Sequence, residues 1–187
     1  RICDSDMPPL NVAYHGMQFT CDSCVARSKL SSTSKPAASS STATLLIKAG
    51  SGATSFDTDS FSKGVPKAVI EKTLSVPYND SKAVEQLFQK YAGQIAAVIV
   101  EPIAGNMGLI PATKEFLQTV RDCCTRDGTL LIFDEVISGF RAGLHGAAGH
   151  YQITPDLATY GKVIAGGFPA AAVGGKREIM EVLAPLG

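Results

Sequence analysis

The stretch TKEFLQTVRDCCTRDGTLLIFDEV (113–136) predicts the fold class of the chain. Its first part predicts an amphipathic helix that stops at Gly128. The apolar residues of this helix share one face: Phe116, Leu117, Val120 and Cys124. TLLIFDEV (129–136) then predicts a strand buried on both faces, because an unbroken apolar run is typical of such strands. A helix followed at once by a buried strand is the repeating unit of an α/β domain.

The same alternation continues on both sides of this stretch. Further strands are predicted at 95–100 (IAAVIV), 156–161 (DLATYG) and 170–175 (AAAVGG). Further helices are predicted at 78–94, with Asp80 as N-cap and Gly93 as stop, and from 177 (REIMEVL). We therefore expect an α/β fold with a mostly parallel sheet and helices on both faces.

The chain divides into two parts of different character. Residues 1–44 are weakly patterned, and the Ser-rich run at 28–44 predicts a flexible segment with little to bury. Residues 45–187 carry the ordered pattern. Within them, 49–66 is rich in Gly, Ser and Asp and predicts a long loop of the kind that closes over binding sites. The chain starts at Arg1 and ends just after a helical pattern, so we expect an internal fragment.

Composition excludes several classes of function. Lys and Arg total 17 of 187 residues and Asp and Glu also total 17, which predicts neither nucleic-acid nor membrane partners. No apolar run approaches the ~18–20 residues that cross a bilayer. The five cysteines form no disulfide framework. Cys21 and Cys24 with His15 could begin a zinc site, but four ligands are not evident, and we expect free thiols and no metal.

Polar residues follow three of the predicted strands. Glu101, Asp134 and Lys162 each come directly after or close behind an apolar run. Ligands of α/β sheets collect beyond the carboxyl ends of the strands, so these residues are candidates for a site. If its strand continues, Val136 shares a side with Asp134. The alternative is that Asp134 caps the following turn.

Lys162 has two interpretations. Alone, it fits an exposed lysine whose stem lies along apolar surface. Together with Asp134 it fits the chemistry of pyridoxal 5′-phosphate (PLP), which requires a lysine for its Schiff base and an acid for its ring nitrogen. The pair makes the second interpretation the stronger hypothesis.

Three stretches extend this hypothesis to a family. LLIFDEVISGFR (130–141), TPDLATYGKVIAGGFP (154–169) and VIVEPIAGNMGLIP (98–111) resemble the signatures of the class III, fold type I, PLP-dependent aminotransferases. The resemblance is nearly continuous from Leu45 to Gly187 and implies the central part of the large PLP-binding domain. Residues 17–44 resemble an insertion.

The resemblance implies a role for each candidate residue. Lys162 would form the Schiff base and then transfer protons, and Asp134 would pair with the pyridinium nitrogen. Val136 and Tyr14 would pack on the two faces of the ring, and Asn106 would lie near its phenolic oxygen. Ser51 would belong to the loop that closes over the substrate, and the loop at 49–66 would be that lid.

Two positions indicate a branch of the family. Many ω-aminotransferases have Glu where this chain has Asn106 and Gln where it has Ile137, so one amide would replace another. This resembles the branch that isomerises glutamate 1-semialdehyde to 5-aminolevulinate. It also implies a homodimer, in the chloroplast stroma of a plant or alga or in a bacterial cytoplasm. A truncated, inactive member and another ω-aminotransferase stay open as alternatives.

Overall fold

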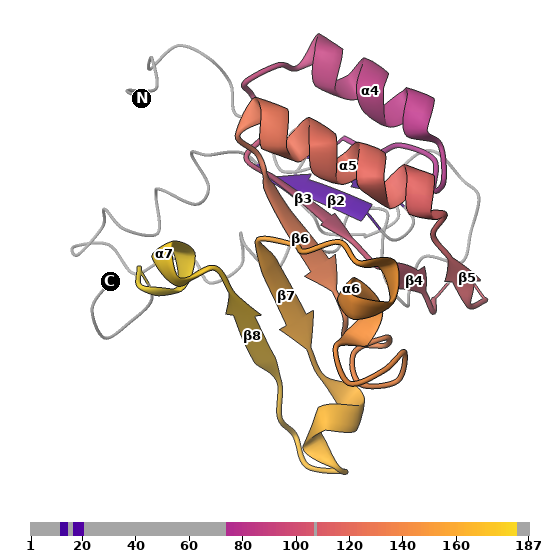
Figure 1. Ribbon diagram of the computed structural model, residues 1–187, viewed down its shortest axis with the longest axis vertical. Helices are drawn as coiled ribbons and strands as arrows, with labels where there is room; N and C mark the ends of the chain where they lie inside the picture. Colours follow the sequence, from indigo (N-terminus) through magenta and orange to yellow (C-terminus); the bar gives the residue numbers. More distant parts are fainter. Residues whose placement is uncertain (1–11, 15–16, 21–73, 107, 183–187) are drawn as a thin grey trace, which may run out of the picture.

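A computed structural model of the chain describes residues 12–14, 17–20, 74–106 and 108–182 (Figure 1). Its main feature is a six-stranded sheet. The strand order is β1 (Val12–Tyr14), β2 (Met17–Thr20), β3 (Ala97–Val100), β6 (Leu130–Asp134), β7 (Leu157–Tyr160) and β8 (Ala172–Gly175). A separate antiparallel pair consists of β4 (Ile103–Ala104) and β5 (Ile110–Pro111). The predicted strands that follow residue 94 are all present, and the predicted α/β fold is confirmed.

The sheet is mixed, so the prediction of a mostly parallel sheet is too strong. Strands β3, β6 and β7 run parallel, whereas β2 and β8 are antiparallel to their neighbours. The connections explain the difference. A parallel pair needs a crossover, and α5 (Lys114–Asp127) lies between β3 and β6 in the chain. Between β7 and β8 the chain forms only the 3-10 turn η2 (Lys162–Ala165), so it reverses direction.

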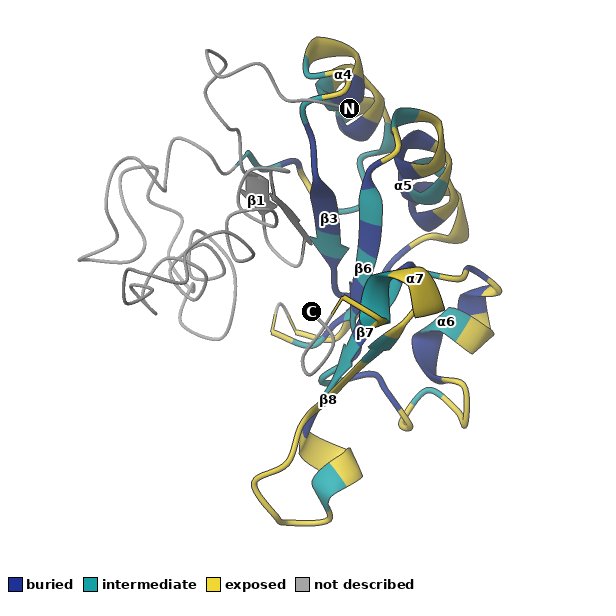
Figure 2. Cartoon of the chain, turned by 90° about the vertical axis from the view of Figure 1, so that its left-hand side faces the viewer, coloured by how far each residue is buried: buried dark blue, intermediate teal, exposed yellow. Residues whose placement is uncertain are grey.

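Helices α4 (Ser81–Lys90) and α5 lie side by side over one face of the sheet (Figures 1 and 2). Asp80 caps α4 as predicted, because its side chain accepts a hydrogen bond from the Ala83 N–H at 2.9 Å. The helix ends at Lys90, three residues before the predicted stop. The predicted stop of α5 is confirmed, since Gly128 adopts the left-handed conformation with φ +78°. Helices on the opposite face stay a prediction.

The hydrophobic core fills the space between these helices and the sheet. Figure 2 shows buried residues, coloured dark blue, in both helices and in the strands β3 and β6. The largest fully buried apolar side chains are Phe116, Leu117 and Val120 of α5, Val84 of α4, and Val98, Val100, Leu131 and Phe133 of the strands. Each contributes about 1.5–3 kcal/mol of hydrophobic stabilisation. The core therefore holds β3 and β6 in place and fixes where both strands end.

Beyond β8, the helix α7 (Arg177–Met180) begins where the pattern predicted a last helix. No helix within residues 74–106 and 108–182 has the length and apolarity that crossing a membrane requires. In the part of the chain that the structure describes, no three His, Cys, Asp or Glu residues form a group able to hold a metal ion. Cys123 and Cys124 are free thiols buried in α5.

Several predictions lie outside the described residues. They concern Ser51, the loop at 49–66, residues 21–44 of the proposed insertion at 17–44, and the Cys21, Cys24 and His15 group. The first residues of that proposed insertion, Met17–Thr20, form β2 and pair with β1 and β3. For Tyr14 the backbone lies in β1, and its side chain is outside the described part.

Candidate active site

Three parallel strands end at one edge of the sheet, and the candidate residues lie there. Glu101 follows β3, Asp134 is the last residue of β6, and Lys162 follows β7 after Gly161. The register places Asp134 directly beside Thr159 of β7. Sequence spacing predicted this gathering, because parallel strands bring their carboxyl ends to the same edge.

The carboxylate of Asp134 ends its own strand. Its Oδ1 accepts a hydrogen bond from the Val136 N–H at 3.0 Å, which makes a tight turn directly after β6. The expectation that the strand continues to Val136 is therefore wrong, and the alternative that Asp134 caps the turn is confirmed. The Thr159 hydroxyl lies 3.5 Å from the same oxygen. Within the described residues, Oδ2 of this half-buried side chain receives no hydrogen bond.

The turn after Asp134 brings Val136 against Gly161. A Cβ atom added to Gly161 would lie 3.4 and 3.7 Å from the two γ-methyl carbons of Val136. The side chain of Val136 therefore packs on the backbone immediately before Lys162. Asp134, Val136 and Lys162 therefore lie in one small region. The turn after Asp134 brings them together, and not the alternation of side chains along a continuing strand.

Lys162 is exposed and begins the turn η2. Its backbone is left-handed, with φ +51°. A non-glycine residue in this region costs of order 1–3 kcal/mol, and such strain gathers at functional sites. Within the described chain, its amine makes neither a hydrogen bond nor an ion pair. The backbone of η2 thus places Lys162 at this edge of the sheet, and no described residue engages its amine.

Glu101 links this edge to Asn106. It is only 7% exposed, its Oε2 accepts from the Gly105 N–H at 3.0 Å, and its Oε1 accepts from Asn106 Nδ2 at 3.1 Å. Burial raises the pKa of the Glu101 carboxyl, and the negative charge of Asp134 raises it further. The two hydrogen bonds and the positive charge of Lys162 oppose this rise. The charges of Asp134 and Lys162 therefore both affect the pKa of Glu101.

The loop after β6 is held by Glu135, which sequence reasoning did not single out. This carboxylate is 1% exposed and accepts three hydrogen bonds: from the Ser138 hydroxyl at 2.7 Å and from the Ala147 and Ala148 N–H groups at 2.9 Å each. The last two donors lie in the first turn of α6 (Gly146–Tyr151). Burial, together with the charge of Glu135, raises the pKa of Tyr160 on β7. The only sequence signal for Glu135 is an acid directly after a buried strand.

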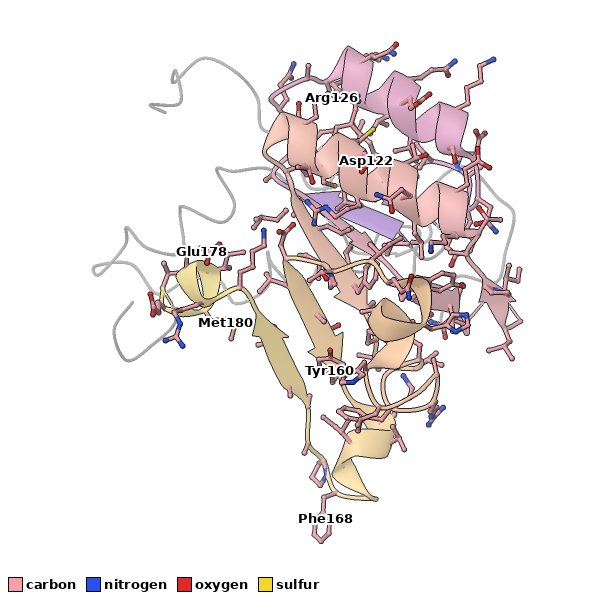
Figure 3. The ribbon with its side chains drawn as sticks, viewed as in Figure 1. Asp122, Arg126, Tyr160, Phe168, Glu178 and Met180 are labelled. Atoms are coloured by element: carbon pink, nitrogen blue, oxygen red, sulfur yellow. The ribbon has the colours of Figure 1, made fainter. Side chains whose placement is uncertain are left out.

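The hairpin that carries Lys162 extends from the sheet. Figure 3 shows Phe168 at the far end of this segment, pointing away from the strands. Its side chain is 80% exposed. Nearer the sheet, the Tyr160 ring lies 5.8 Å from that of Phe140, which ties the start of the hairpin to the loop after β6.

A different aspartate lies at the opposite edge of the sheet. Asp156, 3% exposed, precedes β7 and accepts from the Leu131 N–H at 2.6 Å. It also pairs with Arg121 of α5 at 2.8 Å and with Lys176, just after β8, at 2.6 Å. Burial alone would raise the pKa of Asp156, but these three donors outweigh it and hold the pKa below its usual range. This group joins α5, β6, β7 and the end of β8.

The structure thus brings together four of the predicted residues: Asn106, Asp134, Val136 and Lys162. Sequence reasoning gave Glu101 no role and missed Thr159, which faces Asp134 across the two strands. Glu101 and Thr159 are visible in the sequence as polar residues near the ends of strands. Only the strand register in the structure shows that Thr159 lies beside Asp134.

Comparisons with known proteins identify the family of the chain. The family model described as aminotransferase class-III matches residues 11–187. The chain is 58% identical over 142 residues to the glutamate-1-semialdehyde 2,1-aminomutase of Chlorobium luteolum, a match that covers 76% of this chain and 33% of that protein. The chain therefore spans about a third of the length of this relative.

Solved structures give the same likeness. An omega-transaminase from Sphaerobacter thermophilus superposes with a TM-score of 0.63 at 41% identity, covering 66% of this chain and 28% of that one. A structure described as a transaminase with PLP bound also gives a TM-score of 0.63, at 38% identity, covering 66% and 29%.

Proposed function

The chain belongs to the class III aminotransferase family, and from this premise we propose that it binds PLP through Lys162. We further propose that the whole protein isomerises glutamate 1-semialdehyde to 5-aminolevulinate, a precursor of tetrapyrroles. The observation that carries the proposal is the contact of Val136 with Gly161, because it joins the acid of β6 to the lysine after β7.

The described residues fit the functional groups of PLP. Asp134 has one oxygen committed to the turn and a second that no described donor engages, so it can accept a hydrogen bond from a protonated ring nitrogen. Val136 offers an apolar surface for a flat ring. Asn106 is exposed and carries amide hydrogens for the phenolic oxygen. The amine of Lys162 has no competing structural partner among these residues.

When bound, PLP supplies an aldehyde for the amine and a ring that accepts electrons. The chain's own groups would do the rest. Lys162 would hold the cofactor covalently and then carry a proton to and from the substrate carbon. Asp134 would keep a proton on the ring nitrogen, and Val136 would fix the plane of the ring. Tyr14 on the opposite face and Ser51 in a closing lid remain parts of this proposal.

The substrate proposal rests on the branch of the family. The relative at 58% identity is a glutamate-1-semialdehyde aminomutase. Asn106 and Ile137 agree with that branch, since ω-aminotransferases commonly have Glu and Gln there. Ile137 also fills the space where a Cβ of Gly105 would stand, at 2.5 Å from its Cδ1, so an apolar residue suits this position. The Sphaerobacter likeness favours the second candidate, transfer from an ω-amino acid.

Product analysis decides between these candidates. The protein is supplied with PLP and with glutamate 1-semialdehyde, ornithine or β-alanine in separate reactions. We expect 5-aminolevulinate from the first substrate without any added amino acceptor, because substrate and product are isomers. Conversion of ornithine or β-alanine that requires an added keto acid would identify an ω-aminotransferase. Covalent capture of PLP at Lys162 without turnover of any substrate would identify an inactive member.

Assembly and location complete the proposal. We infer a homodimer, as the family resemblance implies, and light scattering of the purified protein measures it. The expected location is the bacterial cytoplasm, or the chloroplast stroma if the source is a plant or alga. Fractionation of the source cells with an antibody against the chain distinguishes these locations.

A further inference from the structure

The carboxylate of Glu101 holds together the segment of chain that follows it. The segment 101–106, called the Glu101 turn, follows β3 and includes β4, and both oxygens of Glu101 accept hydrogen bonds from the two residues that come after β4. One oxygen accepts from the backbone of Gly105, and the other accepts from the side chain of Asn106. The Tyr78 hydroxyl donates to the Glu101 carbonyl at 2.7 Å. Side chain and backbone of Glu101 are therefore both fixed.

The hydrogen bond to Asn106 decides the orientation of its amide. A carboxylate oxygen only accepts, so the group that faces Oε1 has to be the NH₂ and not the carbonyl of Asn106. One of the two amide hydrogens is used in this contact. The second hydrogen and the carbonyl oxygen stay available at an exposed position. Without Glu101, both flips of the amide would be open to an exposed asparagine.

The turn is also locked against the loop that follows Asp134. Gly105 lies so close to Ile137 that an added Cβ would stand 2.5 Å from Cδ1 and 2.8 Å from Cγ2. Ile137 follows Val136, which packs on Gly161 beside Lys162. The position of Asn106 is therefore coupled by direct packing to the residues that carry Asp134 and Lys162.

We propose that Glu101 is a positioning residue, which holds the Asn106 amide with its nitrogen anchored at the end of β3 and so presents one fixed N–H to the cofactor. This rests on the proposed function, in which Asn106 serves the phenolic oxygen of PLP. Glu101 itself touches neither cofactor nor substrate in this account. Its contribution is to remove the choice between two amide orientations before the cofactor binds.

The amide of Asn106 reports on this contact without any cofactor. In ¹⁵N-labelled full chain, the side-chain NH₂ signals are followed from pH 4 to 8. We expect the Asn106 pair to move with the ionisation of Glu101, whose carboxyl also senses Tyr78, Asp134 and Lys162. Asn79 is the internal control, because its Nδ2 donates to a backbone carbonyl, that of Pro111, and not to a carboxylate. An Asn106 signal as insensitive to pH as that of Asn79 would overturn the proposal.

Two variants extend this test. In Glu101→Gln the pH-dependent movement of the Asn106 signals should disappear, whereas in Asp156→Asn, which changes a buried carboxylate at the other edge, it should remain. Movement that persists in Glu101→Gln would assign the titration to Asp134 or another group and contradict the proposal. Should the Gln variant not fold, the comparison of Asn106 with Asn79 in the unmodified chain still decides.

A double-mutant cycle with PLP tests the positioning itself. We expect Glu101→Gln to weaken covalent capture of PLP roughly tenfold, the loss of one hydrogen bond to a charged group. It should also shift the pH at which the visible absorbance of bound PLP changes. In an Asn106→Ala background the same substitution should add nothing. Additive effects of the two substitutions would refute action through Asn106. Absence of PLP capture in the unmodified chain would refute the proposed function, and the NMR experiment alone would then test the role of Glu101.

Discussion

The two edges of the sheet use the same residue type in opposite ways. At the edge where β7 begins, Asp156 is almost fully buried and accepts from one backbone N–H and two cations. At the edge where β6 ends, Asp134 is half-buried and accepts from Val136 and, at longer range, from Thr159. Both are strand-end aspartates in one sheet. Among the described residues, only Asp156 has a donor for each of its two carboxylate oxygens.

This difference separates structural groups from groups kept available. A buried carboxylate without partners is expensive, so complete pairing at Asp156 is what a stable fold requires. Asp134 has an oxygen that no described donor engages, and the amine of Lys162, on a left-handed backbone, has no hydrogen-bond or ion-pair partner among the described residues. A site that binds a cofactor requires polar groups that still have hydrogen-bonding capacity, as Asp134 and Lys162 do at this partly exposed edge. The amino edge thus stabilises the fold, and the carboxyl edge carries the proposed chemistry.

The same substitution at both aspartates should give the largest contrast. We expect Asp156→Asn to lower the free energy of unfolding by about 3 kcal/mol, because it leaves Arg121 and Lys176 without their buried anion. Asp134→Asn should cost less than about 1 kcal/mol, since an asparagine oxygen can still accept from the Val136 N–H. Urea unfolding at neutral pH measures both. Equal losses at the two positions would remove the distinction between the edges.

A substitution in the Glu101 turn should come next in size. Gly105→Ala places a Cβ 2.5 Å from Ile137 Cδ1, and overpacking of this kind costs about 1–3 kcal/mol. Gly161→Ala is the matched control, because its Cβ would stand 3.4 Å from Val136 and its backbone is extended. Trimming Ile137 to Ala removes both crowding carbons, Cδ1 and Cγ2, so it should recover most of the loss caused by Gly105→Ala and change the control little. Thermal unfolding of the four variants checks this, and an unimproved double variant would contradict the packing argument.

The two edges should also give opposite dependences of stability on pH. The pKa of Asp156 is lowered on folding, so its contribution is complete above the unfolded value near 3.9 and is lost as the pH falls through the folded value. The pKa of Glu101 is raised on folding, so stability decreases as the pH rises from the unfolded value near 4.3 toward the higher folded value.

Unfolding curves between pH 2.5 and 7 separate these contributions. The difference between the unmodified chain and Asp156→Asn should grow as the pH rises to about 4 and then stay constant. The free energy of unfolding of the unmodified chain should fall relative to that of Glu101→Gln as the pH rises above about 4.3. Slopes of the same sign for both variants would show that the two carboxyls are not in contrasting surroundings.

The smallest effect is expected at Lys162. Glycine adopts a left-handed backbone without the strain that a side chain brings, so Lys162→Gly should stabilise the fold by up to about 1 kcal/mol. Lys162→Ala keeps the Cβ and should give no such gain. Thermal unfolding of both variants measures the difference. A destabilised glycine variant would indicate that the lysine side chain itself supports the fold.

The apolar pattern was sufficient to predict the central strands and helices. β3, β6, α4 and α5 appear where periodicity and the capping residues Asp80 and Gly128 indicated them. The direction of β8 was not predictable, since it depends on how the segment after Lys162 turns back. The sequence left the end of β6 open between a strand that continues to Val136 and a turn capped by Asp134. The pattern could not decide, because the hydrogen bond that Asp134 accepts from the Val136 N–H depends on the backbone geometry. Pairings such as Glu101 with Asn106 depend on turn geometry that residue types do not reveal.

Covalent capture of PLP tests the division between the edges most directly. The chain is incubated with increasing PLP, reduced with borohydride and mapped by peptide mass spectrometry. We predict that Lys162 is modified at a PLP concentration about tenfold lower than the exposed Lys114, even if affinity is modest. Asp134→Asn should reduce this preference, and Asp156→Asn, kept below its unfolding temperature, should preserve it. Modification of Lys162 no more readily than of Lys114 would contradict the account.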